Sequence, residues 1–108
     1  MSENSMSSSV QEQVNTIVER FNQKVIQKPA RFFIGRFRGS DVYLDRKEGN
    51  IESKVGRLRY TGDIKDWDFA IYKYSSERYD PDEWLFPGSQ HLDGTVEGAL
   101  KACIEAYP

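Results

Sequence analysis

The sequence predicts an α+β fold of order α-β-β-β-β-α, a four-stranded antiparallel meander sheet with an N-terminal and a C-terminal helix packed on one face. Two stretches, over residues 31–47 and 53–74, alternate apolar with polar residues about a short turn, which is typical of β-hairpins. The stretches before and after them carry apolar residues at helical spacing. A chain of 108 residues can bury one core, so we expect a disordered tail over residues 1–8 and a single domain over residues 9–108.

The first helix is indicated by a start signal, an apolar stripe and a stop signal. Ser9 followed by Glu12 forms a capping box, in which each side chain binds a backbone amide of the other residue. Pro29 cannot continue a helix, so we expect the helix to end near Lys28. The stripe that would pack on the sheet consists of Val10, Val14, Ile17, Val18, Phe21 and Val25.

The hairpin over residues 53–74 sets the register of the predicted sheet. Folding it about its Gly62-Asp63 turn places apolar side chains opposite one another on one face and charged ones on the other. A slip by one residue would bury the charges, so the register is strongly specified. The expected pairs are Tyr60 with Trp67, Leu58 with Phe69, Gly56 with Ile71 and, on the charged face, Arg59 with Asp68.

The first hairpin turns at Gly39-Ser40, a two-residue turn that suits antiparallel strands. If Val42 then faces Leu58, the apolar faces of the two hairpins coincide without adjustment. This agreement between two independently derived registers predicts one four-stranded meander. The pairs expected within the first hairpin are Phe37 with Val42, Gly35 with Leu44, Arg36 with Tyr43 and Arg38 with Asp41.

Residues 75–93 form a connection that is long for a compact domain, and such loops are often functional. Asp80, Pro81 and Glu83 resemble the start of a helix, so we expect a single helical turn around Pro81–Trp84. Asp93 or Thr95 then caps the last helix. Its apolar stripe consists of Val96, Ala99, Leu100, Cys103 and Tyr107.

Composition and termini limit the classes of protein that the sequence allows. The formal charge of −2 gives no overall field that would attract polyanions. The N-terminus has neither a basic start nor an apolar run, and no segment is long and apolar enough to cross a membrane. We therefore expect a cytoplasmic protein that has no membrane partner. The single cysteine, Cys103, excludes an internal disulfide and a multi-cysteine metal site.

Signatures of catalysis are mostly absent from the sequence. There is no phosphate-binding glycine loop, no paired histidine motif and no nucleophile elbow. His91 is the only histidine, and it could form a metal site with the carboxylates of the loop. Because these acids also serve to cap helices and solvate the loop, we expect no metal and no cofactor. A hydrolase or metal-dependent enzyme that uses His91 is the least favoured of three functions. The loop acids are Asp80, Asp82, Glu83 and Asp93.

The favoured function is a non-catalytic binding module that self-associates or binds a protein partner through the last strand and the loop over residues 75–93. The last strand, residues 66–74, is apolar and lacks proline, so an open edge there would invite pairing. Trp84 and Phe86 lie in a run of large apolar residues within the loop. These residues either fold back over the sheet edge or anchor a partner, since aromatic side chains dominate interface energetics.

The alternative is a module that binds single-stranded nucleic acid on the outer face of the sheet. The register places Arg36, Arg38, Asp41, Tyr43, Val55, Arg57, Arg59, Asp68, Tyr72 and Tyr74 on that face. Cross-strand pairing sets Arg59 between Asp41 and Asp68, which neutralises it. The remaining candidate binding residues are Arg36, Tyr43, Arg57, Tyr72 and Tyr74. Arginines interleaved with tyrosines can clamp phosphates and stack on bases, although they also occur on faces that are merely solvated.

Two resemblances accompany these patterns. The segment from the first helix through LRYTGDIKDWDFAIYKY resembles small prokaryotic domains of unknown function, with most of the chain forming one such unit. That resemblance implies no activity. The order of four strands followed by a helix is also similar to folds that bind single strands, such as the Pur-type repeat, which implies fold and not function.

Overall fold

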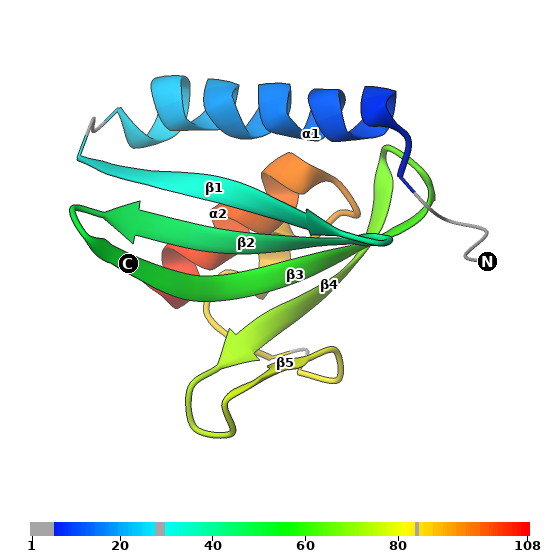
Figure 1. Cartoon of the computed structure of the whole chain (residues 1–108). Coiled ribbons are helices and arrows are strands. Elements are labelled where there is room, and N and C mark those ends of the chain that lie inside the picture. Colours follow the sequence, from blue (N-terminus) through cyan, green and yellow to red (C-terminus); the bar gives the residue numbers. More distant parts are fainter. Residues whose placement is uncertain (1–5, 28–29, 84) are drawn as a thin grey trace.

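The computed structural model describes residues 6–27, 30–83 and 85–108, and it forms one helix-covered antiparallel sheet (Figure 1). The five strands follow one another in the sheet in the order β1-β2-β3-β4-β5. In chain order the elements are α1 (Ser8–Phe21), η1 (Asn22–Ile26), β1 (Arg31–Arg38), β2 (Asp41–Glu48), β3 (Ile51–Asp63), β4 (Asp66–Lys73), β5 (Arg78–Asp80), η2 (Ser89–His91) and α2 (Val96–Ala106).

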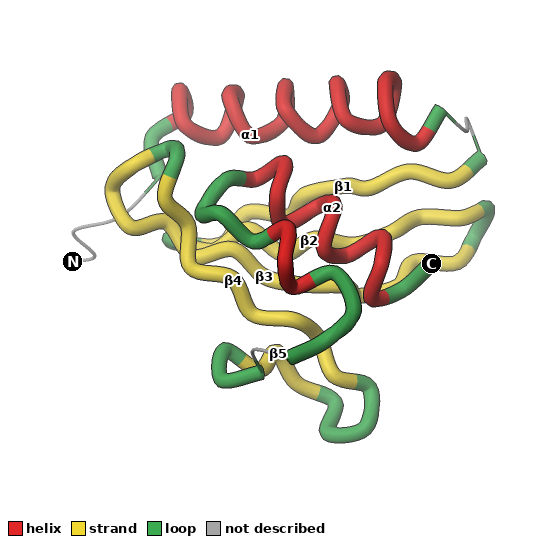
Figure 2. The backbone as a smooth tube through the Cα atoms, turned by 180° about the vertical axis from the view of Figure 1, so that it is seen from behind, coloured by secondary structure: helices red, strands yellow, loops and turns green. Residues whose placement is uncertain are grey.

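The predicted fold class is confirmed, because the sheet is an antiparallel meander with one helix before it and one after it. Both helices lie on the same side of the sheet and contact each other (Figure 2). We call the helix-covered side the inner face and the other side the outer face. The core between the layers is built of apolar side chains from both helices and four strands, among them Val14, Val18, Phe33, Val42, Leu44, Leu58, Trp67, Leu100 and Cys103. No helix among the described residues is long and apolar enough to span a membrane.

The registers predicted for the four long strands are confirmed. Within the first hairpin Arg36 lies opposite Tyr43 and Phe37 opposite Val42. Between the hairpins Val42 pairs with Leu58, as the coincidence of apolar faces required. The pairs of the second hairpin are also those expected: Gly56 with Ile71, Leu58 with Phe69, Arg59 with Asp68 and Tyr60 with Trp67.

The prediction that Val55 belongs to the outer face is wrong. Leu44 pairs with Gly56 whereas Asp45 pairs with Lys54, so β3 carries one extra residue at this point. That residue is Val55, and its side chain is fully buried within the core cluster. A β-bulge explains the difference, because one unpaired residue breaks the alternation of side chains between the faces. Val55 is therefore apolar because its side chain belongs to the core.

The sheet has a fifth strand that the sequence analysis did not predict. β5 pairs with the end of β4 within the loop over residues 75–93 (Figure 1). The helical turn predicted around Pro81–Trp84 is wrong for its described part: Asp80 accepts a hydrogen bond from the amide of Asp82 in a turn, and the short helix of this loop is η2. Trp84 lies outside the described residues.

The boundaries of the helices differ from the prediction by a few residues. Ser7 instead of Ser9 caps α1, accepting a hydrogen bond from the amide of Val10. Met6, in the predicted tail, is buried in the core cluster. The α-helix ends at Phe21 and continues as one π-helical segment, while the predicted end at Lys28 lies outside the described residues. Thr95 caps α2, one of the two alternatives expected.

The edge of β4, which the sequence left open, is covered by the chain itself. β5 pairs with Ile71, Tyr72 and Lys73 at one end of the strand. At the other end the amide of Trp67 donates to the carbonyl oxygen of Gly94 at 2.7 Å. The backbone N–H and C=O groups of every second residue of β4 point away from β3. Between Trp67 and Ile71 this leaves Phe69, for which no backbone partner is found among the described residues. The sequence analysis offers the run that holds Trp84 and Phe86 as one possible cover for this edge, whereas the backbone segments that bind it in the described part of the chain are β5 and Gly94.

The opposite edge of the sheet, at β1, is covered by the N-terminal helical segment. Oδ1 of Asn22 accepts a hydrogen bond from the backbone amide of Phe33 at 2.8 Å, and Nδ2 of Asn22 donates one to the carbonyl oxygen of Phe33 at 2.9 Å. Its side-chain amide thereby takes the place of a neighbouring strand. Both views show α1 running along β1 on the side away from β2 (Figures 1 and 2). Covering an edge with a helix prevents the strand from pairing with another chain.

The second half of the loop is held tightly against α2, and Gly88 makes this possible. Its φ is +99°, and a Cβ added there would lie 2.5 Å from the carbonyl oxygen of Ala102. Gly49 also has a positive φ, +62°, but a Cβ there would meet nothing within 4 Å. Replacing Gly49 therefore adds backbone strain alone, whereas replacing Gly88 adds both backbone strain and a steric clash with α2.

We predict that Gly88→Ala lowers the free energy of unfolding by about 1–3 kcal/mol more than Gly49→Ala, because only the first adds overpacking to strain. Urea denaturation of the two variants measures the difference. Equal losses would show that the loop does not pack on α2.

Candidate binding surfaces

The outer face carries a cluster of tyrosines that we call the tyrosine face, made of Tyr43, Tyr72 and Tyr79 with the cations Arg36, Lys54 and Arg57. Tyr43 and Tyr79 have ring centroids 5.3 Å apart, and Tyr72 and Tyr79 are 4.9 Å apart and edge to face. Tyr79 reaches the cluster because β5 pairs it with Tyr72. The strand absent from the prediction thus completes this surface.

Two cations lie over the rings of the tyrosine face. The guanidinium carbon of Arg36 is 5.5 Å from the ring centroid of Tyr43, and Nζ of Lys54 is 5.4 Å from that of Tyr72. Arg36 also binds Asp45 with two hydrogen bonds, Nε to Oδ2 at 2.5 Å and Nη2 to Oδ1 at 3.2 Å. Part of the hydrogen-bonding capacity of Arg36 is therefore used within the chain, while its side chain stays half exposed.

Arg57 differs from the other arginines of this face. Its cross-strand neighbours are Tyr43 on β2 and Ala70 on β4, which places it at the centre of the sheet. Its Nε is shielded from solvent and has no hydrogen-bond partner among the described residues, and the same is true of the hydroxyl oxygen of Tyr79. Arg59, by contrast, binds Asp41 through Nε at 2.9 Å and Nη2 at 3.2 Å.

The remaining predicted tyrosines are less available than the sequence suggested. Tyr72 is only 7% exposed, so no base could lie flat on its ring without displacing its neighbours. Tyr74 is half exposed, but its hydroxyl donates to the carbonyl oxygen of Lys54 at 2.7 Å. Its ring contacts those of Tyr72 and Tyr107 edge to face. The tyrosines are arranged to pack on one another.

Sequence reasoning missed two members of this surface, Lys54 and Tyr79, and also Asp45, the partner of Arg36. Asp45 follows Tyr43 by two residues, so the predicted register already placed it diagonally across from Arg36. Lys54 was hidden by the bulge at Val55, which shifts the parity of β3. Tyr79 carried no usable signal, because β5 has only three residues and alternation over so short a stretch is not distinctive.

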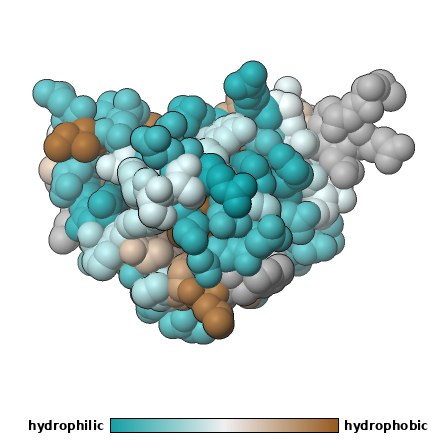
Figure 3. All heavy atoms as spheres, turned by 90° about the horizontal axis from the view of Figure 1, so that it is seen from below, coloured by the Kyte–Doolittle hydropathy of each residue, from teal (hydrophilic) through white to brown (hydrophobic). Residues whose placement is uncertain are grey.

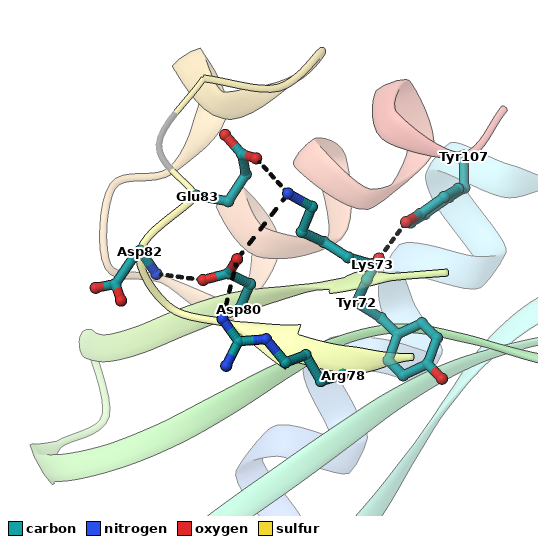
Figure 4. A network of polar contacts seen from close by, with 7 residues as sticks. All are labelled: Tyr72, Lys73, Arg78, Asp80, Asp82, Glu83 and Tyr107. Carbon is teal, nitrogen blue, oxygen red and sulfur yellow. Dashed lines mark hydrogen bonds and ion pairs between the residues drawn. The ribbon is translucent and has the colours of Figure 1, made fainter. Parts of the chain in front are cut away.

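A polar network fastens the loop over residues 75–93 to β4 (Figure 4). Nζ of Lys73 lies 2.8 Å from Oε2 of Glu83 and 4.0 Å from Oδ2 of Asp80. Nη2 of Arg78 lies 3.6 Å from the same oxygen of Asp80. The bond to Glu83 raises the pKa of Lys73, and the same bond lowers the pKa of Glu83. In the same region the Tyr107 hydroxyl donates to the carbonyl oxygen of Tyr72, which ties the end of α2 to the sheet.

Beyond this network the loop presents both anchored and exposed apolar residues. The ring of Phe86 packs 6.2 Å from that of Phe69, so the predicted fold-back over the sheet is confirmed for Phe86. Leu85 is 89% exposed, more than any other large hydrophobic residue that the structure describes. Seen from below, the molecule is mainly hydrophilic with isolated hydrophobic projections (Figure 3). Beside Phe69 a cleft of about 480 Å³ is lined by loop residues that include Leu92 and Gly94.

The groups that could perform chemistry lie apart from the tyrosine face. Nε2 of His91 contacts Oε1 of Glu105 at 2.9 Å, and this bond lowers the pKa of Glu105. In the described part of the chain no three His, Cys, Asp or Glu residues gather closely enough to hold a metal ion. Burial raises the pKa of the Cys103 thiol, and the charge of Arg46 opposes this only in part. The thiolate needed for nucleophilic attack is therefore disfavoured.

Comparison of the chain with protein-family models, curated proteins and solved structures finds no match. The two resemblances noted in the sequence accordingly stay predictions. What the protein does must be argued from its own surfaces.

We predict that Tyr79 ionises later than an ordinary tyrosine. Desolvation and, secondarily, the charge of Asp45 raise its pKa to about 12. An acid whose pKa is raised by folding stabilises the folded state below its unfolded pKa, about 10, and loses that contribution as the pH rises through 12. The free energy of unfolding should fall over this interval in the wild type and less steeply in Tyr79→Phe. Denaturation at a series of alkaline pH values, with the tyrosinate absorbance recorded in parallel, measures both effects. The same slope in the two proteins would contradict the assignment.

Proposed function

We propose that the protein is a non-catalytic binding module that associates with a second copy of itself through the loop over residues 75–93. The observation that carries the proposal is the side chain of Leu85, exposed directly before a part of the loop that packs on the rest of the molecule. Phe86 is anchored on Phe69 and Gly88 is packed against α2. A rigidly presented apolar side chain loses little conformational entropy on binding, which favours its use as an anchor.

The cleft beside Phe69 supports a specific mode of association. It opens at the same edge of the molecule as the loop and is walled in part by Phe69, Leu92 and Ala99. An exposed leucine and a cleft whose mixed wall includes apolar side chains allow one chain to pair with its own copy, as a two-fold interface requires. Addition of a strand is disfavoured as the mode, because the edge strand beyond β4 is the three-residue β5 and the helical segment engages β1 at Phe33.

Sedimentation velocity over micromolar to millimolar concentrations tests this function. The sedimentation coefficient of the wild type should rise with concentration, and Leu85→Asp should abolish the rise, because it removes the apolar anchor and burying a carboxylate against Phe69 and Leu92 is costly. Ile51→Asp is the matched control, since Ile51 is also an exposed hydrophobic residue but lies at the β2–β3 turn. A wild type that stays monomeric throughout, or equal effects of the two variants, would overturn the proposal.

A second candidate is the binding of single-stranded nucleic acid on the outer face. It is favoured by Arg38, Lys54 and Arg57, none of which joins an ion pair among the described residues. Arg38 and Arg57 share the outer face with Tyr43 through the cross-strand register. The burial of Tyr72 counts against it, because stacking on bases would rest on Tyr43 alone.

Fluorescence anisotropy with a labelled single-stranded oligonucleotide distinguishes this candidate. If it binds, affinity should fall with salt along a shallow slope, since only a few phosphates can be neutralised. Arg57→Gln should weaken binding, whereas Arg59→Gln should change it little because Arg59 is already paired with Asp41. Absence of binding at low salt would leave the tyrosine face with a structural role only.

A further inference from the structure

At the end of the molecule away from the β3–β4 turn, the helical segment, the sheet and the end of α2 enclose a pocket of about 300 Å³. Both backbone views place the start of β1 and the C-terminal residues at this end (Figures 1 and 2). Val25 is half exposed at the pocket, so the pocket opens to solvent. Its walls are mainly apolar and are formed by Val25, Ile26, Phe32, Phe33, Ile104, Tyr107 and Pro108.

Among the described residues, the charged side chains that line this pocket are two arginines, Arg31 and Arg46. Arg46 projects from β2 on the inner face, because it pairs with the buried Phe33. A charged side chain on the helix-covered face of a sheet must find partners there, since burying an unpaired charge is costly.

The hydrogen bonds of Arg46 satisfy only part of its guanidinium. Its Nη1 donates to the carbonyl oxygen of Tyr107, but a guanidinium carries five N–H donors. No ion pair among the described residues includes Arg46, and its side chain is half-buried. The second cation is Arg31, whose Nε lies 3.8 Å from Oε2 of Glu48; the Glu48 side chain is 58% exposed. A surface pair at that distance contributes little and leaves Arg31 available.

We propose that this pocket binds a small apolar carboxylate. The carboxylate would receive paired N–H donors from Arg46, with Arg31 as the second cation, and the apolar body would lie against Phe32 and Ile104. Two oxygens match the fork of a guanidinium, and hydrogen bonds between charged partners are stronger than neutral ones. The volume lies at the lower limit of ordinary ligand sites, which restricts the body to one ring or a medium-length chain.

This site is independent of the proposed self-association. The pocket lies at α2's C-terminal end, whereas Leu85 and its cleft lie beside β4 and the loop before α2. Loss of one activity therefore leaves the other testable. The chemistry also differs, because the cleft beside Phe69 is lined by both acidic and basic side chains, whereas the charged side chains of the pocket, within the part of the chain that the structure describes, are both basic.

Octanoate and its neutral analogue octanamide are suitable probes, since they share one apolar chain and differ in charge. We expect octanoate to shift the methyl resonances of Val25 and Ile104 in NMR titrations of the full chain. Octanamide should bind about tenfold more weakly, because it lacks the charge-assisted hydrogen bonds. Arg46→Gln should weaken octanoate binding by a similar factor, while Arg59→Gln on the outer face should leave it unchanged.

Several results would overturn the site. These are no saturable shift with octanoate, equal affinities for the two probes, shifts confined to the Leu85 loop, or undiminished binding by a folded Arg46→Gln variant. Thermal melts establish whether that variant folds, because Arg46 also holds the end of α2 through Tyr107. If the Arg46→Gln variant does not fold, Arg31→Gln is used in its place. The comparison of octanoate with octanamide on the wild type then shows whether the pocket recognises a carboxylate.

Discussion

The register of β3 is the constraint on which the remaining structure depends. This strand has 13 residues and lies at the centre of the sheet, where it pairs with both β2 and β4. Its side chains alternate between Leu58 in the core and Arg57 and Arg59 on the outer face. A shift of one residue against either neighbour would exchange these positions, burying charges and exposing the core. The layer of helices can form on only one side because β3 fixes which side is apolar.

The β-bulge at Val55 determines which residues of β3 before Gly56 lie on the inner face and which lie on the outer face. The bulge adds Val55 to the core and moves Lys54 to the outer face, where it lies over Tyr72. Without the extra residue, alternation would have placed Val55 among the charges. The bulge therefore reconciles an apolar residue at an unfavourable position with a continuous core. It also places the cation of Lys54 on the aromatic cluster.

Most of the fold could be predicted from the sequence because its signals are local and mutually consistent. Turn residues fix the two hairpins, and the pairs Val42–Leu58 and Leu58–Phe69 follow from alternation alone. The bulge could not be predicted, since it arises from competition between the pairing of two strands and the packing of Val55. β5 could not be predicted either, because three residues are too few for a periodic pattern.

The candidate surfaces were predicted less completely than the fold, and the reason is physical. Alternation correctly assigns Arg36, Tyr43 and Arg57 to the outer face, but it says nothing about what each side chain contacts. Arg36 is bound by Asp45, and Tyr72 is covered by its neighbours, so the residues that looked most available are partly used within the chain. Availability depends on partners from distant segments such as β5, whose position follows only from the tertiary structure.

The treatment of the sheet edges narrows the kinds of interaction that this protein can make. Asn22 satisfies the outward backbone groups of Phe33, and among the described residues β5 and Gly94 bind the outer side of β4, which leaves the three-residue β5 as the edge strand. A chain that covers its edges in this way resists uncontrolled strand pairing. Recognition must then rest on side chains, where an isolated leucine, a cluster of cations and a pocket lined by arginine each select a different chemistry. The pocket around Arg46 combines an incompletely paired charge with a mainly apolar cavity, which favours a ligand that is both charged and apolar.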